Sequence, residues 1–329
     1  MMAVMEMKKK PTLGIVVPCY NEEEALPDSA EALDQKLKDL IGKGLVSEKS
    51  FVLFSNDGSK DGTAAYLHKI CHENPRFYMV DLLKNVGHQY ALLAGMQTAA
   101  NFCDCVITID ADLQQDIEAM DAFLEAYENG YEVVYGVRND RSADGFFKKM
   151  TAGAFYGLMH LLGADIKSNA ADYRLMSANA IRSLSEYGES NLFLRGLIPY
   201  MGYPSDTVYF DVKERQKGVS KYTFSKMLTL ALDGITSFSD RPIRLIGTVG
   251  LLMFIFSLGM ILHSVITYIL GANQPGYTTT VISIWMVGGL VMISMGVLGA
   301  YIGKIYSETK HRPRYQIKAT VLPGKEEQD

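Results

Sequence analysis

The stretch VITIDADLQQD, residues 106–116, decides the interpretation of the fold. Its first four residues are apolar or β-branched and suit a buried strand, and they run directly into Asp110, Asp112 and Gln114. In a parallel α/β sheet, ligands bind just beyond the carboxyl ends of the strands. The stretch therefore predicts a strand that ends at a binding edge, with two carboxylates and an amide placed there.

Similar strand-like runs alternate with helical patterns along the first half of the chain. The expected strands are 12–18, 51–57, 77–83, 105–110 and 132–138, and the expected helices are 22–42, 61–72, 88–100 and 116–129, with Pro27 delaying the first of them. This βαβα order predicts an α/β fold with a mostly parallel sheet covered on both faces. Polar clusters fall at four strand ends, at residues 21–24, 56–61, 85–89 and 110–116.

The second half of the chain contains a long segment without charge. Residues 245–303 hold no Asp, Glu, Lys or Arg, and the turn formers of 271–278 divide them. Each half exceeds the roughly 20 helical residues that cross a bilayer core. We expect two transmembrane helices, 245–270 and 278–303; the alternative is a buried hairpin in a soluble core.

Basic residues set the expected orientation of these helices. Arg241 and Arg244 precede the first, Lys304 and Lys310 follow the second, and the connecting loop carries no charge. The positive-inside rule then places both ends in the cytoplasm. The apolar run near the N-terminus is too short for a signal peptide. We therefore expect a multi-pass protein of the cell membrane with a cytoplasmic N-terminal domain.

Composition excludes two other classes of protein. The chain has 329 residues and a net charge of −5, whereas a general nucleic-acid binder would be basic. Its four cysteines do not have the spacing of a zinc site.

The polar end of the opening stretch suggests a metal site. Oxygen ligands from Asp110, Asp112 and Gln114 suit Mg²⁺ or Mn²⁺, which complete their shells with phosphate oxygens. Such an ion would neutralise charge on a departing diphosphate. In the alternative interpretation Asp112 caps the following helix and Asp110 binds backbone amides.

Five motifs in order resemble a known family. They are VVPCYNEEE (16–24), NDGSKDGT (56–63), NVGHQYALLAGM (85–96), DADLQQD (110–116) and ADYRLMS (171–177). Together they resemble the family 2 glycosyltransferases of the GT-A fold. More narrowly they resemble the polyprenyl-phosphate group, which includes bactoprenol glucosyltransferases and dolichol-phosphate mannosyltransferases. The likeness covers about residues 11–240, and the paired C-terminal spans are similar to those of the bactoprenol branch.

The resemblance implies roles for individual residues. A nucleotide-sugar pocket would be lined by Pro18, Tyr20, Asn21, Glu22, Asp57, Asp110 and Arg138, and the metal and diphosphate would meet Asp110, Asp112 and Gln114. Gln115 departs from the His or Asp often found in the family. For Asp57 the alternative is a plain tight turn through Asp57-Gly58-Ser59.

The same resemblance makes Asp172, with Arg174 two residues on, the candidate catalytic base. A lipid phosphate monoester is already mostly dianionic at neutral pH, because its second pKa is near 6. We therefore expect Asp172 to orient the acceptor more than to remove a proton. His88 and Gln89 stand near a helix start that favours anions, so they could meet a phosphate; a capping or packing role is the alternative.

A lipid acceptor is indicated by two segments beside the spans. The basic run 211–227 would attract anionic headgroups, and the resemblance implies that Arg215, Ser220 and Lys221 hold the polyprenyl phosphate. Residues 146–163, and also 222–240, are expected as helices on the membrane surface.

The sequence thus predicts an inverting, metal-dependent hexosyltransferase, acting from a UDP-sugar, first of all UDP-glucose, on undecaprenyl phosphate at the cytoplasmic face. The expected division is a tail (1–10), a GT-A domain (11–232), the two spans and a cytoplasmic basic tail (304–329). Partners are the donor, the lipid acceptor and the bilayer; a homo-oligomer, a flippase and a downstream glycosyltransferase are compatible with it, and nucleic acid is not expected. The alternatives are another sugar (N-acetylglucosamine, galactose or mannose) and a non-catalytic scaffold. A processive synthase is disfavoured, because its Gln-x-x-Arg-Trp motif is missing and Trp285, the single tryptophan, lies in a span.

Overall fold

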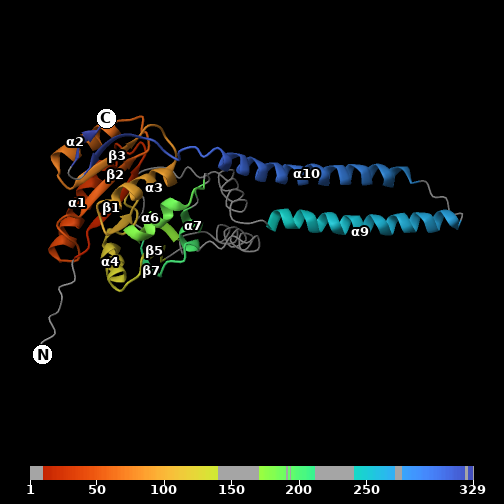
Figure 1. Cartoon of the computed structure of the whole chain (residues 1–329), viewed down its shortest axis with the longest axis horizontal. Coiled ribbons are helices and arrows are strands. Elements are labelled where there is room, and N and C mark those ends of the chain that lie inside the picture. Colours follow the sequence, from red (N-terminus) through yellow and green to blue (C-terminus); the bar gives the residue numbers. More distant parts are fainter. Residues whose placement is uncertain are drawn as a thin grey trace, which may run out of the picture. The chain divides into compact units, whose positions relative to one another are not determined.

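The structure is a computed structural model that describes residues 10–139, 170–189, 192, 194–211, 241–270, 276–322 and 325–328. The chain divides into two compact units. Unit 1 comprises Met1–Met150, Lys167–Ser220 and Arg312–Asp329; unit 2 comprises Thr151–Ile166 and Lys221–His311. Figure 1 labels helices and strands of both units.

Unit 1 is built on one sheet with the strand order β7-β5-β6-β4-β1-β2-β3-β8-β9. The strands are β1 Leu13–Cys19, β2 Phe51–Asn56, β3 Phe77–Leu82, β4 Cys105–Thr108, β5 Val133–Arg138, β6 Ala170–Ser177, β7 Ser205–Phe210, β8 Ile317–Leu322 and β9 Lys325–Gln328. The central four, β4-β1-β2-β3, are parallel. Every residue of β1, β2 and β4 is buried, as expected for strands covered on both faces. The predicted mostly parallel α/β sheet is confirmed.

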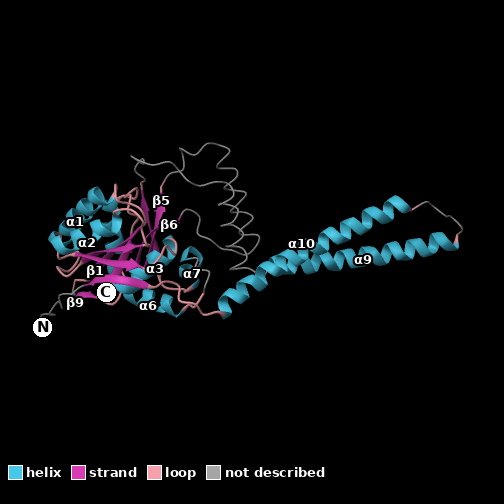
Figure 2. Ribbon diagram, turned by 90° about the horizontal axis from the view of Figure 1, so that it is seen from above, coloured by secondary structure: helices cyan, strands magenta, loops and turns pink. Residues whose placement is uncertain are grey.

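Helices cover both faces of this sheet (Figures 1 and 2). One core cluster holds buried residues of α1 Leu26–Gly42, α2 Thr63–Glu73 and α4 Met120–Glu128; the other holds those of α3 His88–Ala99, α6 Ala178–Glu186 and α7 Leu194–Tyr200. A short 3-10 helix, η1 Ile117–Ala119, precedes α4. Pro27 lies in the first turn of α1, so it delays the helix start as predicted.

β6 is one of the antiparallel strands of this mostly parallel sheet. β6 lies between β4 and β5 and is antiparallel to both, so β5 does not pair with β4. Its side chains alternate: Tyr173 and Leu175 belong to one core cluster and Met176 to the other. Both faces of this strand are therefore buried, and its partners come from distant parts of the chain. A prediction from the order of strands and helices along the chain does not include such pairings.

The C-terminal residues also differ from the expected tail at 304–329. α10 Tyr277–Thr309 ends within this range, and β8 then pairs antiparallel with β3, with Thr320 opposite Val80 and Ala319 opposite Asp81. Ala319 is buried. Without β8, β3 would end the parallel sheet with unpaired backbone groups, so β8 and β9 cover an otherwise open edge.

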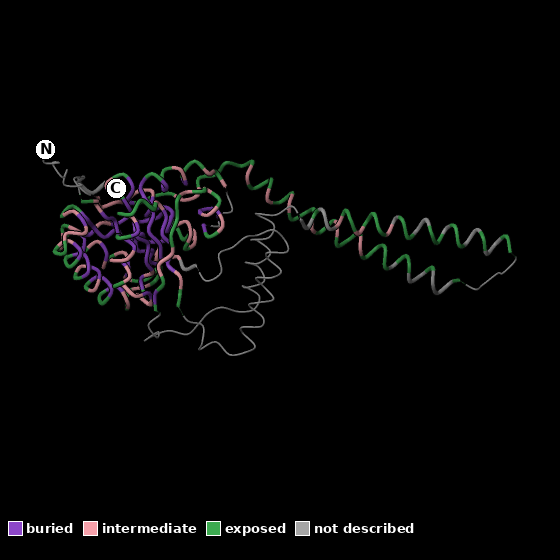
Figure 3. Tube along the Cα trace, turned by 90° about the horizontal axis from the view of Figure 1, so that it is seen from below, coloured by how far each residue is buried: buried purple, intermediate pink, exposed green. Residues whose placement is uncertain are grey.

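Unit 2 contains two long helices, α9 Arg241–Ile269 and α10, which run antiparallel beside each other (Figures 1 and 2). The predicted spans 245–270 and 278–303 fall almost entirely within them. Among the described residues, Met286–Thr309 form a helix long and apolar enough to cross a membrane. Its large apolar side chains, such as Met292 and Ile302, are exposed, whereas buried residues gather around the sheet of unit 1 (Figure 3).

The expected surface helices at 146–163 and 222–240 lie outside the described residues, as do Arg215, Ser220 and Lys221.

Candidate functional site

The loops that follow β1 and β2 are joined by hydrogen bonds at the carboxyl edge of the sheet. The backbone N–H of Asn21 donates to Ser59 Oγ (3.0 Å), and that of Lys60 donates to Asn21 Oδ1 (2.9 Å). Asn21 takes a left-handed conformation (φ 54°), which asparagine tolerates. The N–H of Glu22 donates to Thr63 Oγ1 (3.0 Å). Of the predicted nucleotide-pocket residues in this region, Tyr20 and Asn21 are exposed and Pro18 is buried in β1.

Asp57 connects this pair of loops to the loop before α3. Its Oδ1 accepts from the N–H of Val86 (2.7 Å), and its Oδ2 accepts from the N–H of Gly87 (2.9 Å) and from Asn85 Nδ2 (3.0 Å). Burial raises the pKa of Asp57, and the two backbone donors oppose this. The turn is therefore more than a plain tight turn, because its acid holds the 85–87 loop in place. Its predicted contact with a nucleotide stays a prediction.

Asp110 and Asp112 follow β4 with their side chains held by neighbouring amides. Gln115 Nε2 donates to Asp110 Oδ2, and Gln114 Nε2 donates to Asp112 Oδ2 (2.9 Å). The side chain that caps the next helix is that of Asp116, which accepts from the N–H of Glu118. Asp112 accepts from the backbone N–H of Gln114 (3.3 Å), but the cap of the following helix is Asp116 and not Asp112.

A cluster of charges surrounds Asp172, near the start of β6. Its Oδ1 accepts from Arg174 Nη2 (2.6 Å) and Arg195 Nε (3.3 Å), and its Oδ2 accepts from Arg195 Nη2 (3.0 Å). His88 Nε2 lies 3.6 Å from Asp172 Oδ2 and 3.7 Å from Asp110 Oδ1. His88, the first residue of α3, therefore lies between the carboxylate of β6 and the one that follows β4.

These neighbours set the protonation of the cluster. Although burial opposes ionisation of Asp172, His88, Arg174 and Arg195 hold its pKa far below the usual value of an aspartate. Burial lowers the pKa of His88, but Asp172 and Asp110 outweigh this and raise it. Asp172 is consequently a carboxylate at every physiological pH.

Arg195 and Gln89 are residues whose contacts the sequence did not foretell. Arg195 lies on α7, and Gln89 Oε1 accepts from the N–H of Leu194 (2.9 Å), which ties the start of α7 to the start of α3. In the sequence, Arg195 stands out as a single arginine inside the mostly apolar run NLFLRGLIPY (191–200). No sequence motif links it to Asp172, so the contact could not be predicted. Arg138 ends β5 and is exposed.

Comparison with known proteins agrees with this architecture. Residues 14–185 match the family model described as glycosyl transferase family 2. This chain belongs to glycosyltransferase family 2. The uncharacterized glycosyltransferase YkoT of Bacillus subtilis is 46% identical over 94% of this chain and 92% of its own. The bactoprenol glucosyl transferase of Shigella phage SfV is 37% identical over 93% of this chain and 98% of its own.

Among solved structures, the mannosyltransferase PcManGT of Pyrobaculum calidifontis covers 92% of this chain and 88% of its own, at 14% identity and a TM-score of 0.43. A likeness this distant says nothing about substrate. The family membership, together with the observed sheet, confirms the predicted GT-A fold and the assignment as a glycosyltransferase.

The donor set after β4 fits the divalent cation that a GT-A glycosyltransferase implies. Burial, together with the charges of Asp172 and Asp112, raises the pKa of Asp110 despite His88. A cation beside Asp110 would offset that unfavourable concentration of negative charge, and carboxylate and amide oxygens are the ligands that hard cations prefer. Asp110, Asp112 and Gln114 would hold it.

A second acidic cluster is already neutralised. Asp39, Glu118 and Asp121 place oxygens within 4.8 Å of one another. Lys36 Nζ lies 2.6 Å from Glu118 and 2.7 Å from Asp121, and Lys43 Nζ lies 2.7 Å from both Asp39 and Asp121. These lysines supply the positive charge that a cation would bring.

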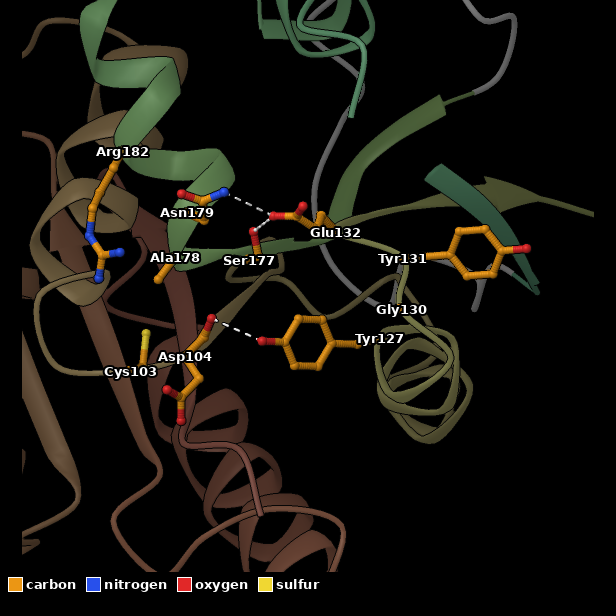
Figure 4. Close-up of a pocket in the computed structure, with 10 residues that line it drawn as sticks. All are labelled: Cys103, Asp104, Tyr127, Gly130, Tyr131, Glu132, Ser177, Ala178, Asn179 and Arg182. Carbon is orange, nitrogen blue, oxygen red and sulfur yellow. Dashed lines mark hydrogen bonds between the residues drawn. The ribbon is translucent and has the colours of Figure 1, made fainter. Parts of the chain in front are cut away.

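A pocket of about 400 Å³ lies at the amino ends of the parallel strands β4 and β5, opposite the carboxyl ends where the candidate site lies (Figure 4). It is lined by residues before β4 and β5 and after β6, including Asp104, Glu132 and Arg182. Parallel sheets bind ligands at their carboxyl ends, so this pocket is separate from the predicted active site.

Proposed function

We propose that this glycosyltransferase moves a single hexose from a nucleotide sugar, UDP-glucose as the first expectation, to undecaprenyl phosphate at the cytoplasmic face of the membrane. One observation carries the proposal: His88 Nε2 lies within 4 Å of both Asp110, on the expected donor side, and Asp172, on the expected acceptor side. A donor bound at Asp110 would therefore lie next to a second, separately charged site.

In the reaction, an oxygen of the lipid phosphate forms a bond to the anomeric carbon while the bond from that carbon to the diphosphate breaks, and the configuration inverts. When bound, a Mg²⁺ or Mn²⁺ ion supplies positive charge to the departing diphosphate. The chain's own groups act by position: Asp57 holds the 85–87 loop beside the donor side, and His88 fixes the distance between the two carboxylates.

Asp172 does not need to take a proton in this mechanism. Its lowered pKa makes it a weak base, and a phosphate monoester, whose second pKa is near 6, is already mostly dianionic at neutral pH. Asp172 instead orients cationic side chains around the attacking phosphate. This role is consistent with the contacts of Asp172, whose two carboxylate oxygens both accept from arginine side chains.

A membrane-bound acceptor is supported from two directions. Relatives named bactoprenol glucosyl transferases match nearly the whole chain, including its apolar C-terminal part. Met286–Thr309 expose apolar side chains along a helix that is long enough to cross a bilayer. The polyprenyl phosphate headgroup would be held by Arg215, Ser220 and Lys221. A homo-oligomer, a flippase and a downstream glycosyltransferase stay predictions.

The test uses the full chain purified in detergent with undecaprenyl phosphate and a panel of radiolabelled UDP- and GDP-sugars. Label that partitions into organic solvent is counted with and without EDTA, and with the acceptor omitted. We expect acceptor-dependent, EDTA-sensitive label from one UDP-sugar, which would also identify the sugar. Absence of lipid label from every donor, with nucleotide binding intact, would refute the proposal.

A further inference from the structure

We propose that Arg195 binds the phosphate of the acceptor, and that Asp172 is the positioning residue that holds the Arg195 guanidinium for this task. The inference rests on the proposed function and adds a specific acceptor-binding residue to it.

The geometry of the pair indicates a fixed guanidinium. Arg195 meets Asp172 through two nitrogens, Nε to Oδ1 (3.3 Å) and Nη2 to Oδ2 (3.0 Å). A bidentate contact of this kind sets the plane of the guanidinium as well as its distance. Gln89 holds the backbone at the preceding residue, Leu194, so that the helix carrying Arg195 is fixed as well.

Exposure separates the two arginines of the cluster. The Arg174 side chain is 1% exposed and that of Arg195 is 43% exposed. Arg174 thus serves as the buried counter-charge of Asp172, whereas Arg195 reaches solvent at the site. A guanidinium is well suited to a phosphate, because its planar set of N–H donors matches the phosphate oxygens.

The charge balance around Asp172 favours an anion. Arg174 and Arg195 both contact Asp172, and His88 lies 3.6 Å from its Oδ2, so cationic side chains gather on this side of the site. On the donor side the balance is reversed, because Asp110 and Asp112 are acidic and call for a cation. An in-line displacement places the attacking and leaving oxygens on opposite sides of the anomeric carbon. The exposed Arg195 guanidinium therefore suits the attacking phosphate, and the acidic pair suits the metal-bound diphosphate.

The experiment compares Arg195→Gln and Arg195→Lys with wild type in full-chain lipid-transfer assays, titrating undecaprenyl phosphate and donor separately. We expect R195Q to raise the KM for the acceptor about tenfold or more while the KM for the donor stays within about twofold. R195K keeps the charge without the bidentate geometry, so it should fall between R195Q and wild type. Arg182→Gln is the matched control, since Arg182 is an exposed arginine at the opposite edge, and it should match wild type.

A double-mutant cycle tests the role given to Asp172. If Asp172 acts through Arg195, adding Asp172→Asn to R195Q should lower kcat/KM for the acceptor by less than about threefold relative to R195Q alone. Fully multiplicative losses would show that Asp172 acts independently and would overturn the inference. An unchanged acceptor KM in R195Q, or a rise in the donor KM in its place, would overturn it too.

Two readouts separate this inference from simpler failures. A lowered thermal midpoint in R195Q and R195K alike, with equal activity losses, would indicate a merely structural arginine and would contradict the inference. Lipid labelling by wild type is measured first. If it is absent, the proposed function falls and this inference falls with it; if it is present and R195Q behaves as wild type, only this inference falls.

Discussion

At the scale of single residues, two acids of the candidate active site already accept hydrogen bonds from protein groups on both carboxylate oxygens. Asp57 uses both oxygens to hold the 85–87 loop, and Asp172 uses both to hold arginines. Neither carboxylate is available as a free base. We therefore expect catalysis in this site to rely on charge and position more than on proton transfer to Asp57 or Asp172.

The first prediction concerns Asp172→Asn. Because the pKa of Asp172 is lowered far below its usual value near 4, the group does not titrate between pH 5 and 9. We expect D172N to reduce kcat/KM about tenfold without changing the shape of the pH–rate profile. Asp112→Asn, which removes an expected metal ligand, should reduce kcat/KM about 10²–10³-fold.

The same pKa fixes the sign of a stability effect. A lowered folded-state pKa stabilises the fold fully above the unfolded value near 4, and this contribution is lost as the pH falls below that value toward the folded-state pKa. The difference in thermal midpoint between wild type and D172N should therefore stay nearly constant from about pH 7 to about pH 5 and shrink as the pH falls below about 4. Loss of a pH–rate limb in D172N would instead identify Asp172 as a titrating base.

A second prediction concerns Gly58, whose φ is 59°. A Cβ there would lie 2.6 Å from the backbone carbon of Lys84, so alanine would push away the loop that Asp57 holds. Gly130 is the matched control: its φ is 96°, but a Cβ would meet nothing within 4 Å. We expect Gly130→Ala to lower the free energy of unfolding by about 1–2 kcal/mol, because alanine is strained at a positive φ. Gly58→Ala should lower it further, because of the added contact with Lys84, and should weaken UDP binding. Equal thermal midpoints for the two variants would contradict this account of the loop.

At the scale of elements, the sequence predicted the strands that can be recognised from their own residues, and it did not predict pairings between distant segments. β1, β2, β3 and β4 are runs of mostly apolar residues, so their place in a parallel sheet and their polar ends were predictable. β6 was not, because its antiparallel position depends on pairing with β4 and β5. The contact of Arg195 with Asp172 was not predictable either, because it joins α7 to β6 with no local pattern.

β8 was missed for a related reason: it is a short strand after a long helix, and its partner β3 lies far back in the sequence. The third prediction uses this strand. Ala319→Asp would bury a carboxylate directly opposite Asp81, whereas Gln316→Glu adds the same charge at an exposed position. We expect A319D to lower the thermal midpoint and to expose the C-terminus to protease, with Q316E close to wild type. Equal protease resistance of the two variants would contradict the pairing.

At the scale of the whole molecule, chain connectivity restricts the membrane topology. The chain leaves unit 1 before α9 and rejoins the same sheet at β8. Whatever crosses a membrane between these points must therefore cross it an even number of times. This supports the predicted pair of spans with both ends on one side, and the basic residues at both ends favour the cytoplasm.

The fourth prediction concerns the two-span arrangement and is tested by cysteine labelling in intact cells. The four native cysteines are buried, and burial raises the pKa of Cys71 and Cys103 to about 12, so they should not react near neutral pH. A membrane-impermeant maleimide should label Gly276→Cys, before α10, and not Gln316→Cys, before β8. Both should react after permeabilisation. Labelling of both variants in intact cells would rule out the two-span arrangement.

The central claim is sugar transfer to a polyprenyl phosphate, and the most direct measurement is lipid-extractable label from UDP-[¹⁴C]glucose with undecaprenyl phosphate, for wild type and D112N side by side. The account predicts acceptor-dependent label with wild type that falls about a hundredfold or more in D112N. Wild type that binds the nucleotide sugar but labels no polyprenyl phosphate, with glucose or any other sugar, would contradict it.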